Sequence, residues 1–189
     1  MKLSKDEKRT LNIFFSNFSE VFFPSFSENN VSDKDLIDFG VDHNYVNNKS
    51  RFKYLQDADQ YIIEKRYVED SVYKYFGTNI EAQSAEPGII YNNGFYYTKQ
   101  GQGEGRPFSQ VNKLYDLGND YYLAYVDIYS EGFEQVSMNA GSQYLYKPLE
   151  DWSQEYRNQI EKIGTKKAKI KKVYENGAFR YILLEYLDA

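Results

Sequence analysis

The chain has 189 residues, of which 41% are hydrophobic and 27% are charged, and it carries a formal net charge of −5 and no cysteine. This length suits one domain, and the hydrophobic fraction is too high for a disordered chain. No stretch approaches the roughly 18 uncharged apolar residues of a membrane span, so a soluble domain is expected. The acidic balance argues against a general nucleic-acid binder. The lack of cysteine excludes disulfides, thiolate metal sites and cysteine nucleophiles.

The first predicted element is a helix from about Lys5 to Phe23, which Pro24 would stop. Ser4 followed by Glu7 is a capping-box pattern, which satisfies backbone N–H groups at a helix start. Behind this cap, large apolar side chains recur at helical spacing and form one stripe: Leu11, Phe14, Phe15, Phe18 and Phe22. Each is worth roughly 1.5–3 kcal/mol on full burial, so the helix must pack against another surface.

Two more helices are predicted before residue 78. Ser32 with Asp35 repeats the cap pattern and begins a helix that ends near Asn48. A third helix follows Ile63 and ends at Gly77, because glycine suits the left-handed residue at a helix C-terminus. Both helices carry an apolar stripe and are expected to contribute to the core.

After residue 77 the pattern changes to β-branched and aromatic residues that alternate with polar ones, which predicts an antiparallel sheet. Asn93-Gly94 and Asn176-Gly177 are strong signals of two-residue hairpins. The expected strands cover residues 88–91, 95–99, 109–117, 121–130, 166–174 and 178–187.

A fourth helix is expected between the last two pairs of strands. Pro148 precedes apolar residues at near-helical spacing, and Gly164 follows them: Leu149, Trp152, Tyr156, Ile160 and Ile163. The predicted fold class is therefore α+β, with N-terminal helices packed on a C-terminal antiparallel sheet of about five to six strands and one helix inserted before the last hairpin. A single domain of residues 1–189 is expected, helical over about 1–77 and sheet over about 78–189.

His43 is the only histidine, and Asp38 and Asp42 lie near it in the sequence, so a carboxylate could orient it as a general base. One histidine cannot build a zinc site in a chain without cysteine, and no Gly-x-Ser-x-Gly pattern places a serine nucleophile. The favoured interpretation is a partly buried, hydrogen-bonded histidine. No catalytic residue is assigned.

Neither a metal nor a cofactor is expected. Asp35, Asp38 and Asp42 share one face of the second helix, where a divalent cation could bind, but the helix dipole also favours such a solvated acidic face. The segment Gly101–Gly105 resembles a phosphate-binding loop only in its glycines, because the lysine is missing and a strand follows. A hairpin loop, or a flap over a binding face, is the interpretation of this segment.

The one basic run of the sequence, Lys166–Lys172, contains five lysines. Alternation in a strand puts Ala168 and Ile170 on one face and three lysines on the other: Lys167, Lys169 and Lys171. Such lysines protect a solvated edge strand from pairing with another chain. With the acidic total, this interpretation is favoured over a patch for RNA or for an anionic membrane.

Aromatic residues make up 18% of the chain, with 20 tyrosines and 13 phenylalanines. In the strand expected at 121–130, Tyr121, Tyr125 and Tyr129 point away from the core-facing side, so both faces of this strand are apolar. An uncovered tyrosine face binds peptides, glycans or other flat ligands by stacking. These tyrosines and His43 are the predicted ligand-binding residues. The simpler alternative is a filled core combined with the codon bias of an A+T-rich genome.

Four short segments carry a resemblance to known sequences: residues 11–18 (LNIFFSNF), 43–48 (HNYVNN), 72–77 (VYKYFG) and 108–111 (FSQV). Together they resemble a group of uncharacterised bacterial proteins, many of which are regarded as exported lipoproteins of Gram-positive anaerobes. The resemblance implies an extracytoplasmic domain that a lipid anchor tethers in its full-length form. This chain departs from the group because the signal segment and the lipid-bearing cysteine are missing.

The leading functional prediction is a non-enzymatic binding or interaction domain of the bacterial cell envelope, which binds a protein, peptide or glycan on its aromatic sheet and does not bind nucleic acid. One alternative is an enzyme with an unfamiliar site around His43 and a nearby carboxylate. Another is a cytoplasmic accessory or immunity-type protein that binds a protein partner through its acidic helix face. An exposed tyrosine face would favour the first prediction, and an open pocket around His43 the second.

Overall fold

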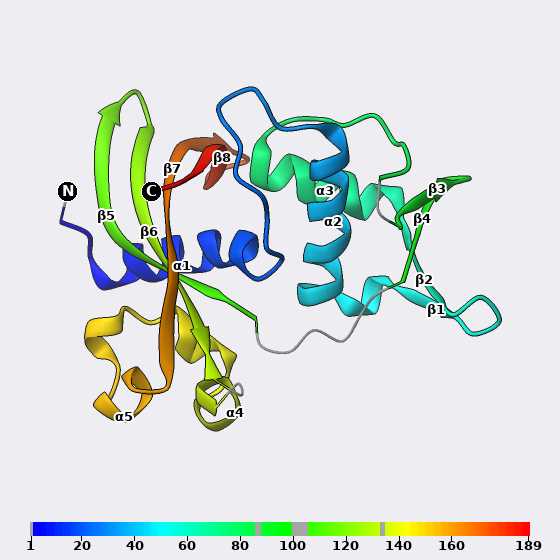
Figure 1. Ribbon diagram of the computed structural model, residues 1–189. Coiled ribbons are helices and arrows are strands. Elements are labelled where there is room, and N and C mark those ends of the chain that lie inside the picture. Colours follow the sequence, from blue (N-terminus) through cyan, green and yellow to red (C-terminus); the bar gives the residue numbers. More distant parts are fainter. Residues whose placement is uncertain (1, 86–87, 100–105, 133–134) are drawn as a thin grey trace. The chain divides into compact units, whose positions relative to one another are not determined.

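The computed structural model of the protein describes residues 2–85, 88–99, 106–132 and 135–189. Within them the chain forms helices and two four-stranded antiparallel sheets (Figure 1), so the predicted α+β class is confirmed. The chain divides into two compact units: the sheet unit, Met1–Ser27 with Gly103–Ala189, and the helical unit, Glu28–Gln102. That the two units act as one domain remains a prediction from the sequence.

The sheet unit contains a meander of four long strands with a helix across it. The strand order is β5-β6-β7-β8, so each strand pairs with its neighbour in the sequence. The Asn176-Gly177 hairpin is confirmed, since both residues have the positive φ angles, 51° and 79°, that a type I′ turn requires. The elements are α1 (Lys5–Ser19), β5 (Phe108–Gly118), β6 (Tyr121–Glu131), α4 (Gln135–Ala140), η3 (Ser142–Tyr146), η4 (Leu149–Asp151), α5 (Gln154–Arg157), β7 (Ile160–Glu175) and β8 (Ala178–Asp188).

Helix α1 crosses one face of this sheet, here called the inner face (Figure 1). The Phe14 ring lies 5.8 Å from that of Tyr181, and the Phe18 ring lies 6.1 Å from that of Tyr186, between centroids. The inner face also contains small and branched side chains that are almost completely buried: Ala124, Val126, Ala168, Ile170 and Leu183. The predicted phenylalanine stripe thus packs on the sheet, where burial of its rings stabilises the unit.

Helix α1 begins where the sequence predicts and ends earlier. The capping box of Ser4 and Glu7 is present at its start. The helix stops short of the predicted Phe23 because Phe22 adopts a left-handed backbone with φ 53°, and the Phe23 amide then donates to the Phe18 carbonyl over 2.9 Å. This ending usually has glycine at the left-handed position, so a phenylalanine there is strained.

A buried amide network joins α1, β5 and η3. The Asn12 side chain is completely buried and donates to the Gln110 side chain over 2.8 Å and to the Tyr146 carbonyl over 3.1 Å. Its Oδ1 accepts from the Val111 amide over 2.7 Å. Gln110 donates in turn to the Leu145 and Lys147 carbonyls, on either side of Tyr146, over 2.7 and 3.0 Å. Every polar group of the two amides that faces the interior is therefore used to fix β5 against the helix.

The interpretation of Lys166–Lys172 as an edge strand is wrong. These residues lie in β7, which pairs with β6 on one side and with β8 on the other. The division of the run into two faces is confirmed, because Ala168 and Ile170 are fully buried and the alternate lysines are half-exposed. Side-chain alternation indicates which residues share a face, but it does not indicate how many neighbours a strand has.

The predicted fourth helix is also different in the structure. The segment forms the short helices η4 and α5, and Ile160 and Ile163 belong to β7 instead. Ser153 caps α5 through its side chain, and this interrupts any continuous helix from residue 149. Beyond it, Ile160 pairs with Glu131 at the end of β6, so the long ladder extends further than the sequence suggests.

The helical unit contains three predicted features and one that was missed. Helices α2 and α3 and the Asn93-Gly94 hairpin are confirmed, but the hairpin strands join a sheet of order β1-β2-β4-β3 in this unit, which leaves four strands in the C-terminal sheet. Strands β1 and β2 are short and follow one another just before α3, so their alternation gives little signal. The elements are α2 (Asp33–Asn47), η1 (Lys49–Arg51), β1 (Lys53–Leu55), β2 (Gln60–Glu64), α3 (Lys65–Phe76), β3 (Ile90–Asn92) and β4 (Phe95–Thr98).

Close backbone contact holds α2 against α3. A Cβ atom on Gly40 would lie 2.7 Å from Val68 Cγ1 and 3.1 Å from the Val68 carbonyl. One turn further along α2, the buried Asn44 amide donates to the Tyr67 carbonyl and to Ser71 Oγ, over 3.0 and 2.9 Å.

None of the described helices combines the length and the apolar character that a membrane span requires.

Replacement of Asn12 by alanine should lower the free energy of unfolding of the sheet unit by about 2–4 kcal/mol, because the Val111 amide and the Gln110 side chain would lose buried partners. Asn17→Ala is the matched control. Asn17 lies in the same helix, is 7% exposed and donates only to carbonyls of its own helix. Urea denaturation should show a loss of under about 1 kcal/mol for the control. Equal losses for the two variants would contradict the role given to the network.

Gly40→Ala should destabilise the helical unit by about 1–3 kcal/mol, despite the better helix propensity of alanine, since the added methyl group collides with α3. Gly164→Ala in β7 serves as the control, because a Cβ there meets nothing within 4 Å. Thermal unfolding of both variants checks the expectation. A stabilised Gly40→Ala protein would show that the helices separate without cost.

Candidate functional site

The sheet unit has a second face, here called the outer face, on the side of the sheet opposite α1. Residues directly opposite one another on paired strands point to the same side of a sheet. The register therefore places one set of side chains together on the outer face: Lys113, Tyr115, Tyr121, Leu123, Tyr125, Lys167, Lys169, Lys171, Ile182, Glu185 and Leu187. Leu117 joins them, because it lines the same groove as Tyr115 and Leu123.

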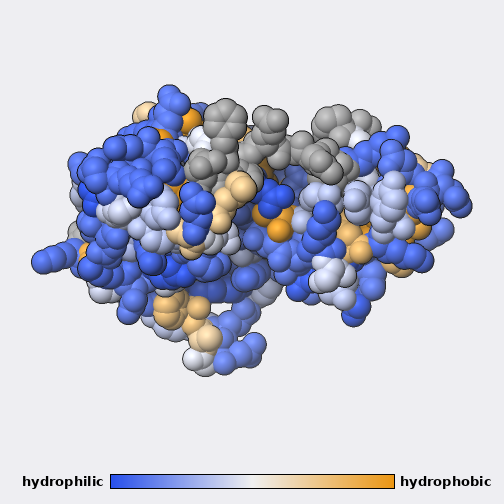
Figure 2. Space-filling view, turned by 90° about the horizontal axis from the view of Figure 1, so that it is seen from below, coloured by the Kyte–Doolittle hydropathy of each residue, from blue (hydrophilic) through white to orange (hydrophobic). Residues whose placement is uncertain are grey.

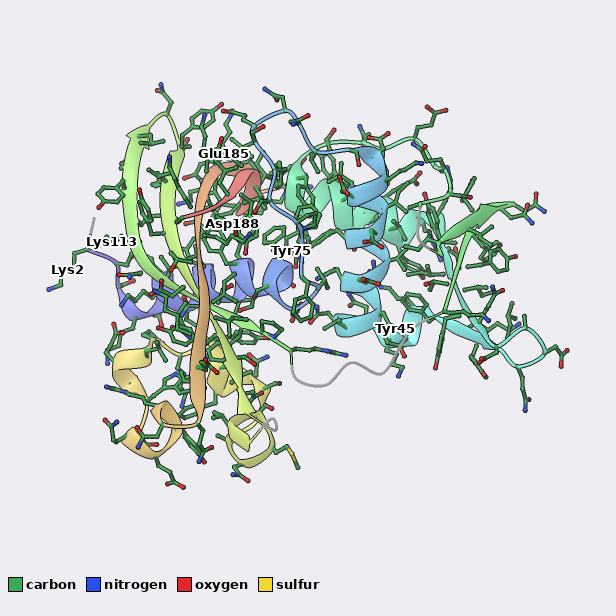
Figure 3. The ribbon with its side chains drawn as sticks, in the orientation of Figure 1. Lys2, Tyr45, Tyr75, Lys113, Glu185 and Asp188 are labelled. Carbon is green, nitrogen blue, oxygen red and sulfur yellow. The ribbon has the colours of Figure 1, made fainter. Side chains whose placement is uncertain are left out.

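The outer face is accessible and partly apolar. Tyr115 and Leu117 are 46% and 53% exposed, and Leu123 and Tyr125 beside them are half-buried. These four side chains line a shallow groove together with Lys113, whose side chain extends from β5 (Figure 3). The side of the protein drawn in Figure 2 is largely hydrophilic, with apolar residues in small separate groups. Grouped tyrosines and leucines on an open sheet face mark a surface suited to binding.

The outer face is also basic, in a chain whose net charge is −5. It carries four lysines and, among the residues that define it, one carboxylate, Glu185. The Lys171 and Lys169 ammonium groups lie 4.9 and 5.5 Å from the centre of the Tyr121 ring, within the range of cation–π attraction. Asp116 at the groove turns back and accepts from the Gly118 amide over 2.7 Å. Positive charge and aromatic rings are thus interleaved on this face.

Asp127 lies at the end of the outer face and is neutralised there. It is 8% exposed, and its carboxylate lies 2.7 Å from the Lys162 ammonium group. It also accepts from Thr165 over 2.9 Å and from Asn112 over 3.1 Å. A buried carboxylate with three partners supports the sheet and adds little negative charge to the open surface.

Two of the three predicted platform tyrosines lie together on the accessible part of the outer face, and the third is covered by the segment after β6. Tyr121 and Tyr125 flank Leu123, as the alternation predicts. Tyr129 follows an irregularity in the pairing after Ile128, and its ring stacks on Phe108 at 5.7 Å. It belongs to a separate cluster formed around Phe108, Val136, Leu145 and Trp152. The segment after β6 therefore packs on Tyr129 and leaves Tyr121 and Tyr125 accessible.

His43, the fourth predicted site residue, is in the interior of the helical unit. It is 4% exposed, stacks on Phe39 with ring centroids 5.4 Å apart, and meets the edge of Tyr75 at 4.8 Å. Its Nδ1 lies 3.3 Å from the amide nitrogen of Asn47. Burial, and then the charges of Lys74 and Arg51, lower the pKa of His43 to about 4. In the described part of the chain, His43 therefore lacks the open access that a general base requires.

The acidic face of α2 also has a structural role. Asp35 accepts from the Ser32 hydroxyl over 2.6 Å, and the two form the capping box at the start of the helix. Within the described residues, no three histidine, aspartate or glutamate side chains gather closely enough to hold a metal ion. The glycine segment Gly101–Gly105 lies outside the described residues.

The contribution of β5 to the outer face was not predicted from the sequence. Lys113, Tyr115 and Leu117 alternate as a strand should, but a break in the pairing between Val111 and Lys113 changes which residues face outward. The lysines of β7 were recognised as one face and assigned to the wrong kind of strand. Comparison of β5 with β6 would have suggested a shared tyrosine face, because both end at the turn of residues 118–120.

Comparisons with protein-family models, with curated protein sequences and with solved structures found no match. The resemblance to exported bacterial lipoproteins therefore stays a prediction. Inferences about function rest on the geometry described above.

The low pKa of His43 predicts how stability depends on pH. Because the unfolded chain binds the His43 proton near pH 6.5 and the folded protein only near pH 4, stability is lost as the pH falls through this window. The expected contribution is on the order of 3 kcal/mol. His43→Phe keeps an aromatic ring and should flatten this part of the profile, measured by urea denaturation between pH 4 and 7. An NMR titration that gives His43 a pKa near 6.5 would contradict the burial argument.

Proposed function

We propose that the protein is a non-enzymatic binding domain that holds an acidic segment of a protein partner on the outer face of its β5–β8 sheet. The observation that carries this proposal is the gathering of tyrosines and lysines on the accessible side of the sheet in an acidic chain. Tyr115, Tyr121 and Tyr125 supply rigid contact area with a phenolic hydrogen-bonding group. The lysines supply charge complementary to carboxylates.

An acidic protein segment fits this surface better than the other ligands that tyrosines bind. Sites for neutral glycans combine aromatic rings with side chains that both donate hydrogen bonds to sugar hydroxyls and accept them. The polar groups around Tyr121 are ammonium groups, which only donate. Nucleic acid would gain from the same lysines, but the net charge of −5 opposes a long phosphate backbone beyond the face. A short acidic segment with apolar side chains matches both the charge and the groove of Tyr115, Leu117 and Tyr125.

The contact should be weakened by salt and depend on few side chains. Lysines on an open face are screened at physiological ionic strength, where the Debye length is about 8 Å. Most of the affinity in such an interface comes from a small number of central aromatic residues. Tyr125 is at the centre here, because its ring meets that of Tyr115 edge-on at 6.2 Å and its strand neighbours are Lys113 and Lys167.

A location in the bacterial cell envelope belongs to the same proposal and is supported by the sequence resemblance alone. Fractionation of the native host with an antibody against the protein tests this part separately. Recovery of the protein with cytosolic markers would overturn the location and would favour the alternative of a cytoplasmic accessory protein, without affecting the outer face as the binding surface.

The binding proposal predicts that Tyr125→Ser and Lys171→Glu each weaken capture of a labelled copolymer of glutamate and tyrosine by about fivefold or more. Tyr174→Ser and Lys172→Glu are matched controls, because both residues lie in β7 on the side opposite Lys171, and Tyr174 is 66% exposed. Fluorescence anisotropy at two salt concentrations gives the affinities, and amide chemical shifts locate the contact.

Equal losses in the control variants, or shifts that avoid β5, β6 and β7, would overturn the assignment of the outer face. Oligothymidylate and polygalacturonate of similar length are the competing probes. Tighter capture of either one through Tyr125 would keep the face as a binding surface and overturn the acidic protein segment as its ligand.

A further inference from the structure

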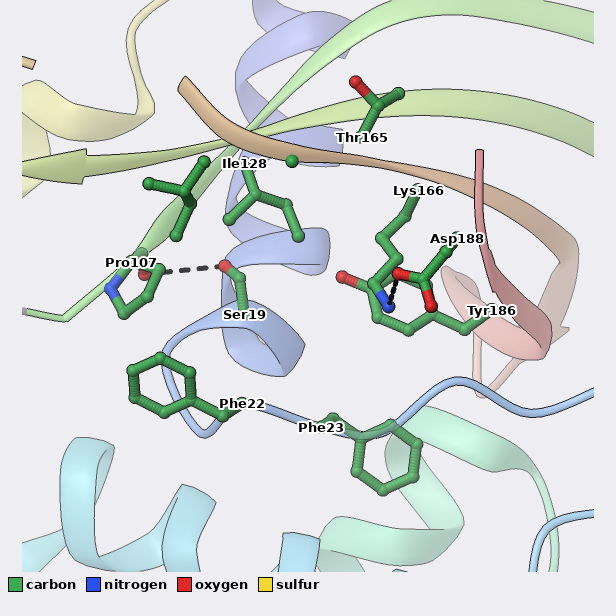
Figure 4. A pocket seen from close by; sticks show the side chains of 11 residues that line it. Ser19, Phe22, Phe23, Pro107, Ile128, Thr165, Lys166, Tyr186 and Asp188 are labelled. Atoms are coloured by element: carbon green, nitrogen blue, oxygen red, sulfur yellow. Dashed lines mark hydrogen bonds and ion pairs between the residues drawn. The ribbon is translucent and has the colours of Figure 1, made fainter. Parts of the chain in front are cut away.

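A second hollow in the sheet unit lies beside the C-terminal end of α1 and is separate from the outer face (Figure 4). It is a pocket of about 210 Å³ whose walls are polar and apolar in nearly equal parts. Phe22 and Phe23 follow α1, Pro107 precedes β5, and Ile128 and Ile163 come from β6 and β7. A volume of this size equals the share of about seven water molecules in the liquid, so it suits a small organic molecule.

Tyr186 lines this pocket and carries an unused hydrogen-bond donor. The residue is 1% exposed, and its hydroxyl has no hydrogen-bond partner among the described residues. Figure 4 shows the ring reaching from β8 with its hydroxyl directed toward the side where Ser19 and Ile128 lie. Burial raises the pKa of Tyr186, so the group stays protonated and able to donate. A buried hydroxyl without a partner costs free energy, which an acceptor on a bound molecule would recover.

The charged groups of the pocket already neutralise one another. The Lys166 ammonium group lies 2.6 Å from the Asp188 carboxylate and donates to the Ser25 hydroxyl over 2.6 Å. Ser19 and Thr165 are likewise engaged, with the Pro107 carbonyl and with Asp127. A charged ligand would have to compete with these contacts. A neutral ligand would leave them intact.

Phe22 is strained and exposed at the same pocket. Its φ is 53°, a conformation that bulky residues rarely adopt, and 71% of its surface is accessible. A glycine would end α1 without this strain. Strained residues are concentrated at ligand sites, where the side chain is needed in spite of its cost. The ring at this position forms one wall of the pocket.

We propose that this pocket binds a small neutral molecule that combines an aromatic or branched aliphatic body with one oxygen acceptor, such as a ketone, and that the Tyr186 hydroxyl donates to this oxygen. The apolar side chains of the pocket hold the body, and Phe22 closes one side of it. This binding site is separate from the outer face. The proposal for it does not depend on which partner the outer face binds.

The test compares acetophenone with ethylbenzene, which have the same ring and a two-carbon substituent and differ by the carbonyl oxygen. Chemical-shift titration of the full chain should move the amides of Phe22, Gly164 and Lys166. Acetophenone should bind about tenfold more tightly than ethylbenzene, as one buried hydrogen bond allows. Tyr186→Phe should remove this preference and also raise Tm by a few degrees, because the unpartnered hydroxyl is gone.

Three results would overturn the proposal. One is the absence of shifts at the pocket for either probe at its solubility limit. Another is an unchanged preference, or a lowered Tm, in Tyr186→Phe. The third concerns Phe22→Gly, which relieves the backbone strain and should fold at least as well while weakening both probes about fivefold or more. Unchanged binding in that variant would remove Phe22 from the site. Tyr125→Ser on the outer face is the control and should leave acetophenone binding as it is.

Discussion

The sheet unit depends on the hydrogen bonds of one buried amide. Asn12 of α1 accepts from the backbone of β5 and donates to both Gln110 and the turn that follows α4. Apolar packing alone would let a helix slide on a sheet, since phenylalanine rings tolerate several positions. A buried amide is different, because each group left unpaired costs about 1–3 kcal/mol. The network therefore fixes the position of α1 on the sheet.

Because α1 is held in this position, the two faces of the sheet differ in exposure. The inner face receives the phenylalanines and is closed by them. The outer face receives no comparable helix from the described part of the sheet unit, and it retains tyrosines, leucines and lysines that are too exposed to serve as core. The same helix ends in the strained turn of Phe22, which forms the second candidate site. The packing of α1 thus determines the position of both candidate binding sites, the outer face and the pocket at Phe22.

Much of the fold could be predicted, because its signals are local. The capping boxes at Ser4 and Ser32 and the Asn-Gly hairpins each require only neighbouring residues. What could not be predicted depends on distant pairing. The two neighbours of β7 and the break before Lys113 arise from the register between strands, and Tyr129 is covered by a segment that follows β6. His43 is buried by Tyr75, which lies in another helix. Two of the platform tyrosines were predicted, and the lysines that give the outer face its character were misassigned.

The hydrogen bonds at the sheet margins have a further consequence for a protein so rich in tyrosine. On one margin, Asn12 and Ser16 accept from the amides of Val111 and Ser109, and a bulge follows at Lys113. On the other margin, Phe26 exchanges two backbone hydrogen bonds with Tyr186. A single N-terminal segment thereby occupies backbone groups on both margins that could otherwise recruit a strand from another molecule. At these points the two edge strands of an aromatic sheet are not open to pairing with another molecule.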